Sequence, residues 1–361
     1  MTPDKDPFSY MLVDPIEEVL DAARRGEPVV LVDNEDRENE GDVVIAAEFA
    51  TPEVIALMAR RASGLICLAL TESRATDIGL SRCNDLSRHC PNQTAFTQSI
   101  DASYGVTTGI SAADRAHTIA AAIDPDQGPD SFCSPGHLFP LLARRGGVLE
   151  RPGHTEAAVD IARLAGLTAA GVICEIMLDD GSMARLPDLV RFCAEHDLRL
   201  GTIADLVDWR LHHDRLVIRR HQRGRHFTYD DLVCGGRHVF SVPTEFSGHV
   251  PLVFGGMPTI SEVRAGPPGA AYLQLSEVFA PQPGRAPSDV AVAIAAQVLR
   301  DVGIESVLEI DPSQRLDRLQ RYGIGTRYAQ QPNAQPPSQE GGSVNRRRQT
   351  AAAVDSTGGL V

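Results

Sequence analysis

The chain has 361 residues, 34 Lys and Arg against 48 Asp and Glu, a formal net charge of −14, and 43% hydrophobic residues. These values are ordinary for a globular protein of about two domains, and the negative charge argues against a nucleic-acid-binding surface. The single lysine, Lys5, lies near the N-terminus. This excludes a phosphate-binding P-loop and an enzyme that forms a Schiff base on a buried lysine.

No apolar run approaches the ~20 residues of a transmembrane helix, and the N-terminal segment lacks the basic and apolar regions of a signal peptide. The seven cysteines contain no CxxC pair, which favours free thiols over a disulfide framework or a zinc ribbon. We therefore expect a cytoplasmic protein with no membrane and no nucleic-acid partner.

Residues 14–210 alternate helical and strand-like hydrophobic patterns, which is typical of a layered α/β domain. Strands are predicted at Pro28–Val32, Leu65–Leu70 and Gly171–Leu178. Helices are predicted at Pro15–Arg24, Pro52–Arg61, Ala112–Ala122, Glu156–Ala165 and Pro187–His196. The composition changes after Trp209, so we expect one domain over residues 1–213 and a smaller one over 214–329 with a helix at Asp289–Val302. The polar segment 330–361 is predicted to be a disordered tail.

Six carboxylates and one arginine fall within Asp33–Asp42, directly after a predicted strand. Such a run is often a solvated turn, but α/β proteins bind ligands in the loops at strand ends. Packed carboxylates repel one another unless a cation lies between them, and oxygen ligands suit Mg²⁺. Arg37 is suited to an anionic or hydroxylated substrate. We therefore expect a candidate metal and substrate site here.

A second candidate site is the segment Arg151–Glu156, which precedes a predicted helix. Thr155 is a natural N-cap, and the unpaired N–H groups of a helix start, its dipole and Arg151 together suit a phosphate group. The alternative is that Thr155 only caps the helix and that His154 is a surface residue. The motif by itself leaves both interpretations open.

Two further residues are candidates for proton transfer. His137 follows a Pro-Gly pair, where a histidine can act as a general acid or base or can simply be a solvated turn residue. Glu175 lies within an apolar strand, so it must be paired, near a metal or protonated, and we expect burial to raise its pKa. The alternative for Glu175 is a structural role, bonded to the backbone. Cys67 is expected to be a buried, inert thiol.

The motifs occur in an order that resembles 3,4-dihydroxy-2-butanone 4-phosphate synthase over roughly residues 14–210. The segments that carry the resemblance are Asp36–Asp42, Gly64–Cys67, Thr94–Thr97, Thr108–Ser111, Gly136–His137 and Gly153–Glu156. The resemblance implies a lyase of riboflavin biosynthesis that converts D-ribulose 5-phosphate to L-3,4-dihydroxy-2-butanone 4-phosphate and formate with Mg²⁺ or Mn²⁺. It also implies a three-layer α/β sandwich with a mixed sheet, and a homodimer with sites at the subunit interface.

The same resemblance assigns roles to individual residues. Glu38 and His154 would bind the metal, and Arg37 and Asp42 would contact the sugar. His137 and Glu175 would move protons. The 5-phosphate would be held by Arg151, Pro152, Gly153, His154 and Thr155. Pro152 has no amide hydrogen, so we expect weaker phosphate contact there, and the loop at residues 82–93 looks idiosyncratic.

The second domain faintly resembles the end of GTP cyclohydrolase II at Ala296–Ile304 and Arg321–Ile324. That enzyme needs three zinc-binding cysteines, whereas Cys234 is the only cysteine in residues 214–329. We therefore expect a degenerate, divergent α/β domain without cyclohydrolase activity. The alternatives are a bifunctional enzyme with unconventional zinc ligands, such as histidines within residues 221–249, and a non-catalytic scaffold that kept the fold.

Overall fold

The computed structural model describes residues 13–82, 94–223, 226–233, 236–241, 252–253, 270–274, 305–310 and 325–328, together with Ala293, Ile294, Gln297 and Asp301. Among these residues, no helix is long and apolar enough to cross a bilayer. The predicted tail at 330–361 and the loop residues 83–93 lie outside the described residues. Within them, the thiols of Cys67, Cys133, Cys174 and Cys193 are free.

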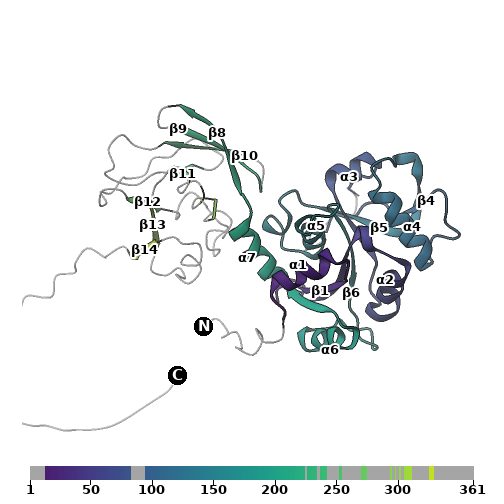
Figure 1. Ribbon diagram of the computed structural model, residues 1–361. Coiled ribbons are helices and arrows are strands. Elements are labelled where there is room, and N and C mark those ends of the chain that lie inside the picture. The colour runs from purple at the N-terminus through teal and green to yellow at the C-terminus, as the bar shows by residue number, and fades with distance from the viewer. Residues whose placement is uncertain are drawn as a thin grey trace, which may run out of the picture.

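Residues 13–213 are built on a seven-stranded sheet with the strand order β4-β5-β3-β6-β2-β1-β7 (Figure 1). The pairs β1–β7 and β3–β5 are parallel, and the other neighbouring pairs are antiparallel. The predicted mixed sheet is therefore confirmed. Its strands are β1 (Val29–Val32), β2 (Gly41–Ala46), β3 (Cys67–Thr71), β4 (Ile100–Ala102), β5 (Phe132–Ala143), β6 (Ala170–Glu175) and β7 (Arg199–Thr202).

Helices cover both faces of this sheet, because the strands alternate their apolar side chains between two cores. The core on one face includes residues of α1 (Ile16–Arg24), α5 (His154–Leu164) and α7 (Ile203–His213). The core on the other face includes residues of α2 (Pro52–Leu57), α3 (Glu72–Asp77), α4 (Ala112–Ile123) and α6 (Leu186–His196). The result is the three-layer arrangement that the sequence predicts.

Each predicted helix of this domain is present, with two differences in detail. The predicted helix Pro52–Arg61 changes at Met58 into a π-helical turn, Met58–Ala62, which ends at Ser63 in the left-handed region with φ 65°. Helix α5 begins at His154 and not at Glu156, which places His154 and Thr155 inside its first turn. Gly166 follows the end of α5, with a φ of 83° and its N–H bonded to Arg163 O.

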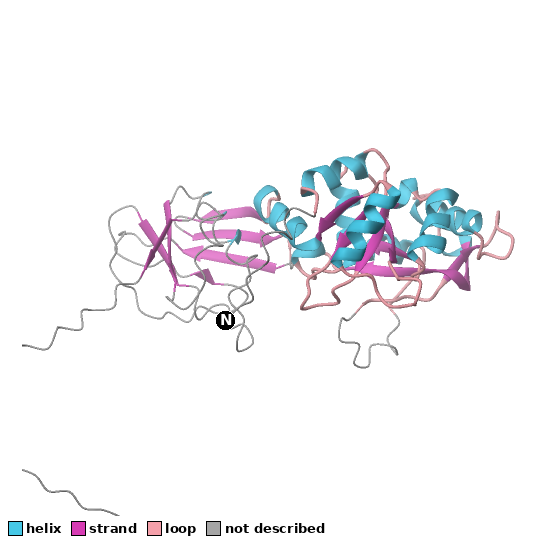
Figure 2. Cartoon of the chain, turned by 90° about the horizontal axis from the view of Figure 1, so that it is seen from below, coloured by secondary structure: helices cyan, strands magenta, loops and turns pink. Residues whose placement is uncertain are grey.

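The described part of the second domain contains two further sheets. The antiparallel one consists of β8 (Val217–Arg223), β9 (His226–Asp231), β10 (Gly236–Ser241) and β11 (Leu252–Val253). The parallel one consists of β12 (Ala270–Gln274), β13 (Glu305–Ile310) and β14 (Gly325–Tyr328). Figure 2 shows these strands to one side of the helix-covered domain. Four residues of the predicted helix at 289–302 are described, and all four are helical.

Candidate active site

Asp33 organises the acidic segment from its centre, and its side chain is fully buried. One carboxylate oxygen accepts the N–H of Glu40 at 2.9 Å. The other accepts the N–H of Glu38 at 3.1 Å and the Arg37 guanidinium at 2.7 Å. Because one buried carboxylate accepts hydrogen bonds from three other residues of the segment, the segment is a structured loop and not a solvated turn.

Arg185, at the N-terminus of α6, holds the same loop from outside. Its guanidinium donates to the carbonyl of Glu38 at 2.9 Å and also to the carbonyl of Asn39. Asn39 has a φ of 54°, a left-handed conformation that asparagine adopts more readily than most residues. The loop therefore presents the Glu38 side chain from a backbone that is fixed at both ends. Sequence reasoning included Asp33 in the acidic run without giving it a role of its own, and it missed Arg185.

Asp42 lies on a strand and not in the loop, because β2 begins at Gly41. It pairs with Glu175 of β6 across the antiparallel ladder, so both side chains lie on the same face of the sheet. Asp42 is only 2% exposed, and its Oδ1 has no hydrogen-bond partner among the described residues. Burial, followed by the charges of Glu175 and Glu38, raises the pKa of Asp42 well above its usual value.

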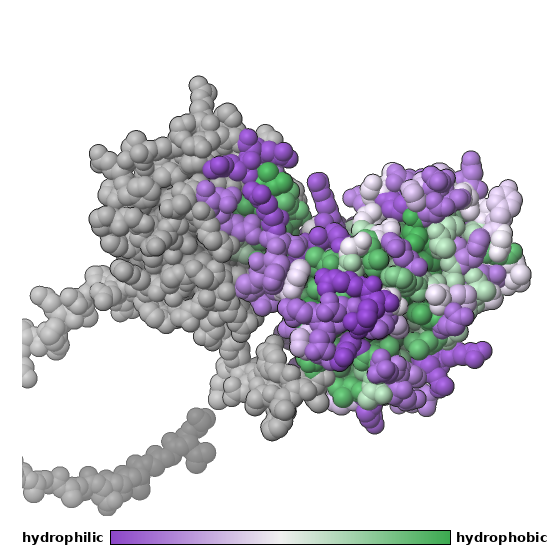
Figure 3. Space-filling model, viewed as in Figure 1, coloured by the Kyte–Doolittle hydropathy of each residue, from purple (hydrophilic) through white to green (hydrophobic). Residues whose placement is uncertain are grey.

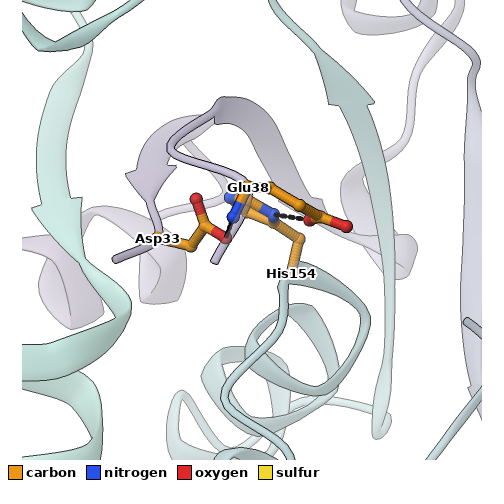
Figure 4. Close-up of side chains that lie close together, drawn as sticks. All are labelled: Asp33, Glu38 and His154. Carbon is orange, nitrogen blue, oxygen red and sulfur yellow. Dashed lines mark hydrogen bonds and ion pairs between the residues drawn. The ribbon is translucent and has the colours of Figure 1, made fainter. Parts of the chain in front are cut away.

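His154 faces these carboxylates from the first turn of α5. Its Nε2 lies 3.2 Å from the carbonyl oxygen of Leu31, and because a carbonyl only accepts, Nε2 carries the proton. The lone pair of Nδ1 is then available 3.7 Å from Asp42 Oδ1 and 3.9 Å from Glu38 Oε2. Burial lowers the pKa of His154, which favours this neutral form. Figure 4 shows the side chains of Glu38 and His154 directed toward one another.

The donor set fits a divalent cation. Asp33, Glu38 and His154 each offer a ligand atom within 4.8 Å of the others, but both oxygens of Asp33 already accept hydrogen bonds within the loop. The groups that can face a cation are the Glu38 carboxylate, whose Oε2 also accepts the Arg37 guanidinium at 2.5 Å, the neutral His154 nitrogen and Oδ1 of Asp42, which accepts no hydrogen bond from a described residue. A buried carboxylate oxygen without a partner is costly, and a cation at this position would remove that cost.

Glu175 is the last residue of β6 and is half-buried. The predicted strand Gly171–Leu178 is therefore wrong at its C-terminal end, and Glu175 lies at the end of the strand and not within it. Its Oε2 accepts the N–H of Leu65 at 2.8 Å. A Cβ at Gly64 would lie 2.3 Å from the Glu175 carbonyl oxygen and 2.7 Å from Oε2. The π-helical turn before Ser63 thus leads into a segment that fits closely around this carboxylate.

The N-terminus of α5 forms an open anion site. Its N-cap is Gly153, which has no side chain to accept from the first-turn N–H groups. The prediction that Thr155 is the cap is therefore wrong: Thr155 is buried within the first turn. A Cβ at Gly153 would lie 2.5 Å from Arg151 Nη1 and 2.9 Å from Arg37 Nη2, so two guanidinium groups converge there. Helix N–H groups beside two arginines suit a phosphate.

The guanidinium of Arg151 is held in place by its neighbours. It bonds to Glu156 at 2.5 Å and to the Thr94 hydroxyl at 3.1 Å. Thr94 belongs to a segment that the family resemblance singled out without a role. Pro152 is exposed between Arg151 and Gly153. The structure therefore brings Arg37, Glu38, Asp42, the segment 151–155 and Glu175 to one end of the sheet.

His137 lies elsewhere on the same sheet. It belongs to strand β5 and not to a turn, and its ring Nδ1 lies 2.7 Å from Oδ2 of Asp101. Strand β5 is separated from β6 by β3, which at ~4.8 Å per strand places the His137 backbone roughly 10 Å from that of β6. Sequence reasoning missed Asp101, although one carboxylate in the apolar triplet Ile100–Ala102 resembles the pattern that identified Glu175.

A mixed α/β sheet with a carboxylate and histidine cation site beside an open helix N-terminus defines a class of protein suited to bind a metal and a phosphorylated ligand together. A model of the family 3,4-dihydroxy-2-butanone 4-phosphate synthase matches residues 17–209. The chain therefore belongs to the 3,4-dihydroxy-2-butanone 4-phosphate synthase family.

Two similar curated proteins come from bacteria. The 3,4-dihydroxy-2-butanone 4-phosphate synthase of Pseudomonas syringae pv. tomato is 50% identical over 240 residues, which cover 64% of this chain and 65% of that protein. The riboflavin biosynthesis protein RibBA of Aquifex aeolicus is 56% identical over 204 residues, which cover 56% of this chain and 50% of that protein. The chain thus spans between half and two thirds of the length of these relatives.

Two solved structures resemble the fold. RibBX of A. baumannii, a two-domain 3,4-dihydroxy-2-butanone 4-phosphate synthase, is 36% identical with a TM-score of 0.68, over 87% of this chain and 99% of that one. A 3,4-dihydroxy-2-butanone 4-phosphate synthase in complex with two magnesium ions is 42% identical with a TM-score of 0.52, over 54% of this chain and 96% of that one.

Proposed function

We propose that this chain is a lyase of riboflavin biosynthesis, which converts D-ribulose 5-phosphate to L-3,4-dihydroxy-2-butanone 4-phosphate and formate. The observation that carries the proposal is the adjacency of two sites. Arg37 and Gly153 belong to the anion site, while their sequence neighbours Glu38 and His154 belong to the cation site. A small sugar phosphate carries its phosphate a few carbon atoms from its hydroxyl groups, so one ligand can reach both neighbouring sites.

Phosphate binding, metal binding and proton transfer are assigned to different residues of the site. Arg37, Arg151 and the N–H groups of α5 bind the phosphate, and Gly153 keeps the approach open. Glu38 and His154, with Asp42 beside them, would hold Mg²⁺ or Mn²⁺, which supplies Lewis-acid stabilisation of enediolate oxygens. Glu175 exchanges protons with the sugar from its fixed position against Leu65, and His137 is the second proton-transfer group.

Magnesium is supported by the related structure that contains two magnesium ions and by the oxygen-rich donor set of this chain. Manganese accepts the same carboxylate and imidazole ligands. The chain has no lysine suited to form an imine with the substrate, and this agrees with a metal-dependent reaction. A bound metal ion supports enolisation next to a ketone, so that no imine is needed.

We further propose a cytoplasmic homodimer with its sites at the subunit interface. Two large apolar side chains are exposed on the two sides of the Thr107–Gly109 segment in the sequence: Tyr104 is 82% exposed and Ile110 is 52% exposed. They flank the Thr107–Gly109 loop, which packs against His137. Hydrophobic patches also interrupt the hydrophilic surface of the face in Figure 3. A second copy that covers this loop would bury these two side chains and place His137 at the subunit interface.

The domain division at 1–213 and 214–329 is likewise a proposal. It is supported by the separate sheets and by the two-domain RibBX structure, which is similar over most of this chain. We propose that residues 214–329 are a degenerate relative of GTP cyclohydrolase II that does not open the guanine ring. The alternative of a bifunctional enzyme is supported by the similarity to RibBA proteins. It is tested by incubation with GTP and measurement of the formate released.

The proposed function is tested by formate release from ribulose 5-phosphate in Mg²⁺ and in EDTA. Glu38→Gln should abolish turnover, whereas the matched control Glu35→Gln should keep it, because Glu35 is an exposed residue of the same loop. Binding of Mn²⁺, followed by electron paramagnetic resonance, should be lost in the first variant and kept in the second. Equal activity of both variants would refute the proposed metal site.

A further inference from the structure

Asp101 directs both of its carboxylate oxygens to one residue. Oδ1 accepts the main-chain N–H of His137 at 2.9 Å, and Oδ2 lies 2.7 Å from the Nδ1 of the same ring. Asp101 is 6% exposed, whereas the side chain of His137 is 43% exposed. A buried carboxylate thus holds the backbone and the ring of an accessible histidine.

The backbone is shaped to allow this contact. The ladder between β4 and β5 shifts its register between Ile100 and Asp101, and a bulge of this kind redirects a side chain. At the same level, a Cβ on Gly136 would lie 2.0 Å from the carbonyl carbon of Ile100 and 2.3 Å from the nitrogen of Asp101. Only glycine lets the two strands approach so closely, and the approach brings Asp101 beside His137.

A second segment closes over the pair. Gly109 has a φ of 90°, and a Cβ there would lie 2.1 Å from Asp101 Oδ2 and 2.7 Å from His137 Nδ1. Asp114 fixes this segment, because it accepts the hydroxyl and the N–H of Thr107 and the N–H of Gly109. The hydrogen bonds from Thr107 are the main cause that lowers the pKa of Asp114 to about 2. The Asp114 carboxylate therefore stays ionised.

The contact decides which ring nitrogen is free. An ionised carboxylate only accepts hydrogen bonds, so neutral His137 carries its proton on Nδ1 and leaves the lone pair on Nε2. We propose that Asp101 is a positioning residue, which fixes His137 in the Nδ1–H form so that Nε2 is the atom that exchanges protons with the substrate. The proposal rests on the proposed function only for the identity of that substrate.

The proton balance of the step is simple. A C–H bond of the sugar breaks and its proton moves to Nε2 of His137. The electron pair of that bond stays on the sugar, which becomes an enediolate, and the ring becomes an imidazolium. Asp101 does not take the proton: it keeps the Nδ1–H bond and its negative charge stabilises the imidazolium. Return of the proton from Nε2 to the sugar restores the neutral ring.

The test combines a structural and a kinetic readout on the full chain. Nitrogen-15 NMR of histidine-labelled protein reports which ring nitrogen carries the proton, and the His137→Gln variant assigns the signal. The wild type should show Nδ1–H. In Asp101→Asn, the amide can donate to Nδ1, and the proton should move to Nε2. Turnover should then fall about 10²- to 10⁴-fold, with KM changed less than about threefold. Asp126→Asn, which changes an exposed carboxylate in the turn after α4, is the matched control and should behave as the wild type.

The outcomes separate the positioning role from the proposed function. An Nε2–H ring in the wild type would overturn the proposal without any variant, even if Asp101→Asn failed to fold. A folded Asp101→Asn with unchanged turnover, or with reduced turnover and the Nδ1–H ring retained, would also overturn it. If the wild type releases no formate but its ring shows Nδ1–H and switches in Asp101→Asn, the positioning contact is supported and the proposed function fails.

Discussion

Replacement of Asp42 by Asn should stabilise the metal-free protein while it abolishes activity. The buried Oδ1 of Asp42 has no partner among the described residues, and neighbouring carboxylates raise the pKa of this group. An unpartnered buried polar group costs about 1–3 kcal/mol, and more if it is charged. The amide of Asn removes the charge and can donate toward the Nδ1 lone pair of His154. At roughly 2–4 °C per kcal/mol for a domain of this size, the melting temperature should rise by about 2–12 °C.

The stability difference between Asp42→Asn and the wild type should depend on pH in a defined direction. Because the pKa of Asp42 is raised in the folded state, that state binds more protons than the unfolded one between the ordinary and the raised pKa. Stability of the metal-free wild type should therefore fall as the pH rises through this window, and the advantage of Asp42→Asn should be larger at pH 8 than at pH 5.

Thermal unfolding in EDTA and in Mg²⁺ provides the assay. Mg²⁺ should stabilise the wild type more than Asp42→Asn. Asp36→Asn, an exposed carboxylate of the same loop, should change stability by no more than about 0.5 kcal/mol. An Asp42→Asn variant that is less stable than the wild type in EDTA at pH 8 would refute the argument from the unpartnered carboxylate.

Three further predictions follow from the site and the domain boundary. EDTA should abolish formate release and Mg²⁺ should restore it, whereas His154→Ala should remain inactive in saturating Mg²⁺; activity of this variant would place the cation elsewhere. Glu175→Gln should bind ribulose 5-phosphate almost normally, measured by calorimetry, and lose turnover about 10²-fold or more; normal turnover of a folded variant would make Glu175 structural. A chain that ends at His213 should keep synthase activity. Its melting temperature should be lower than that of a chain that ends at Leu216, because the shorter chain lacks the Asp214 carboxylate that Arg210 contacts at 2.8 Å. If the shorter chain is a folded but inactive dimer, the second domain contributes to the site.

The sequence predicted the layered fold because the helices of the first domain carry clear one-sided apolar patterns, as Ile16–Arg24 and Leu186–His196 show. It missed four strands of the sheet, β2, β4, β5 and β7. In β2 and β5, charged or turn-forming residues lie within the strand. Asp42 continues the acidic run, and His137 follows Pro135 and Gly136, so neither segment has the alternating pattern of a strand. Both strands form because their neighbours in the sheet supply the hydrogen bonds, which a local pattern does not reveal.

The environments of the candidate residues differ from those expected from the sequence. Residue type and order singled out Glu38, His154 and Glu175 as candidates, but the buried carboxylate oxygen without a hydrogen bond belongs to Asp42, and Glu175 is half-buried against Leu65. Asp33 contacts residues four to seven positions away within its own loop. Arg185 and Asp101 instead act on residues that are distant in sequence: Arg185 contacts carbonyls 146 and 147 positions away, and Asp101 contacts His137, 36 positions away. Such long-range contacts leave no local signal in one sequence.

The most direct measurement of the central claim follows both products from one reaction. Purified full-length protein is incubated with ribulose 5-phosphate and Mg²⁺, formate is measured enzymatically, and the four-carbon phosphate is measured by NMR; a parallel reaction contains GTP. We expect formate and 3,4-dihydroxy-2-butanone 4-phosphate in equal amounts and no formate from GTP. Absence of both products from ribulose 5-phosphate, in protein that is folded and binds Mg²⁺, would contradict this expectation.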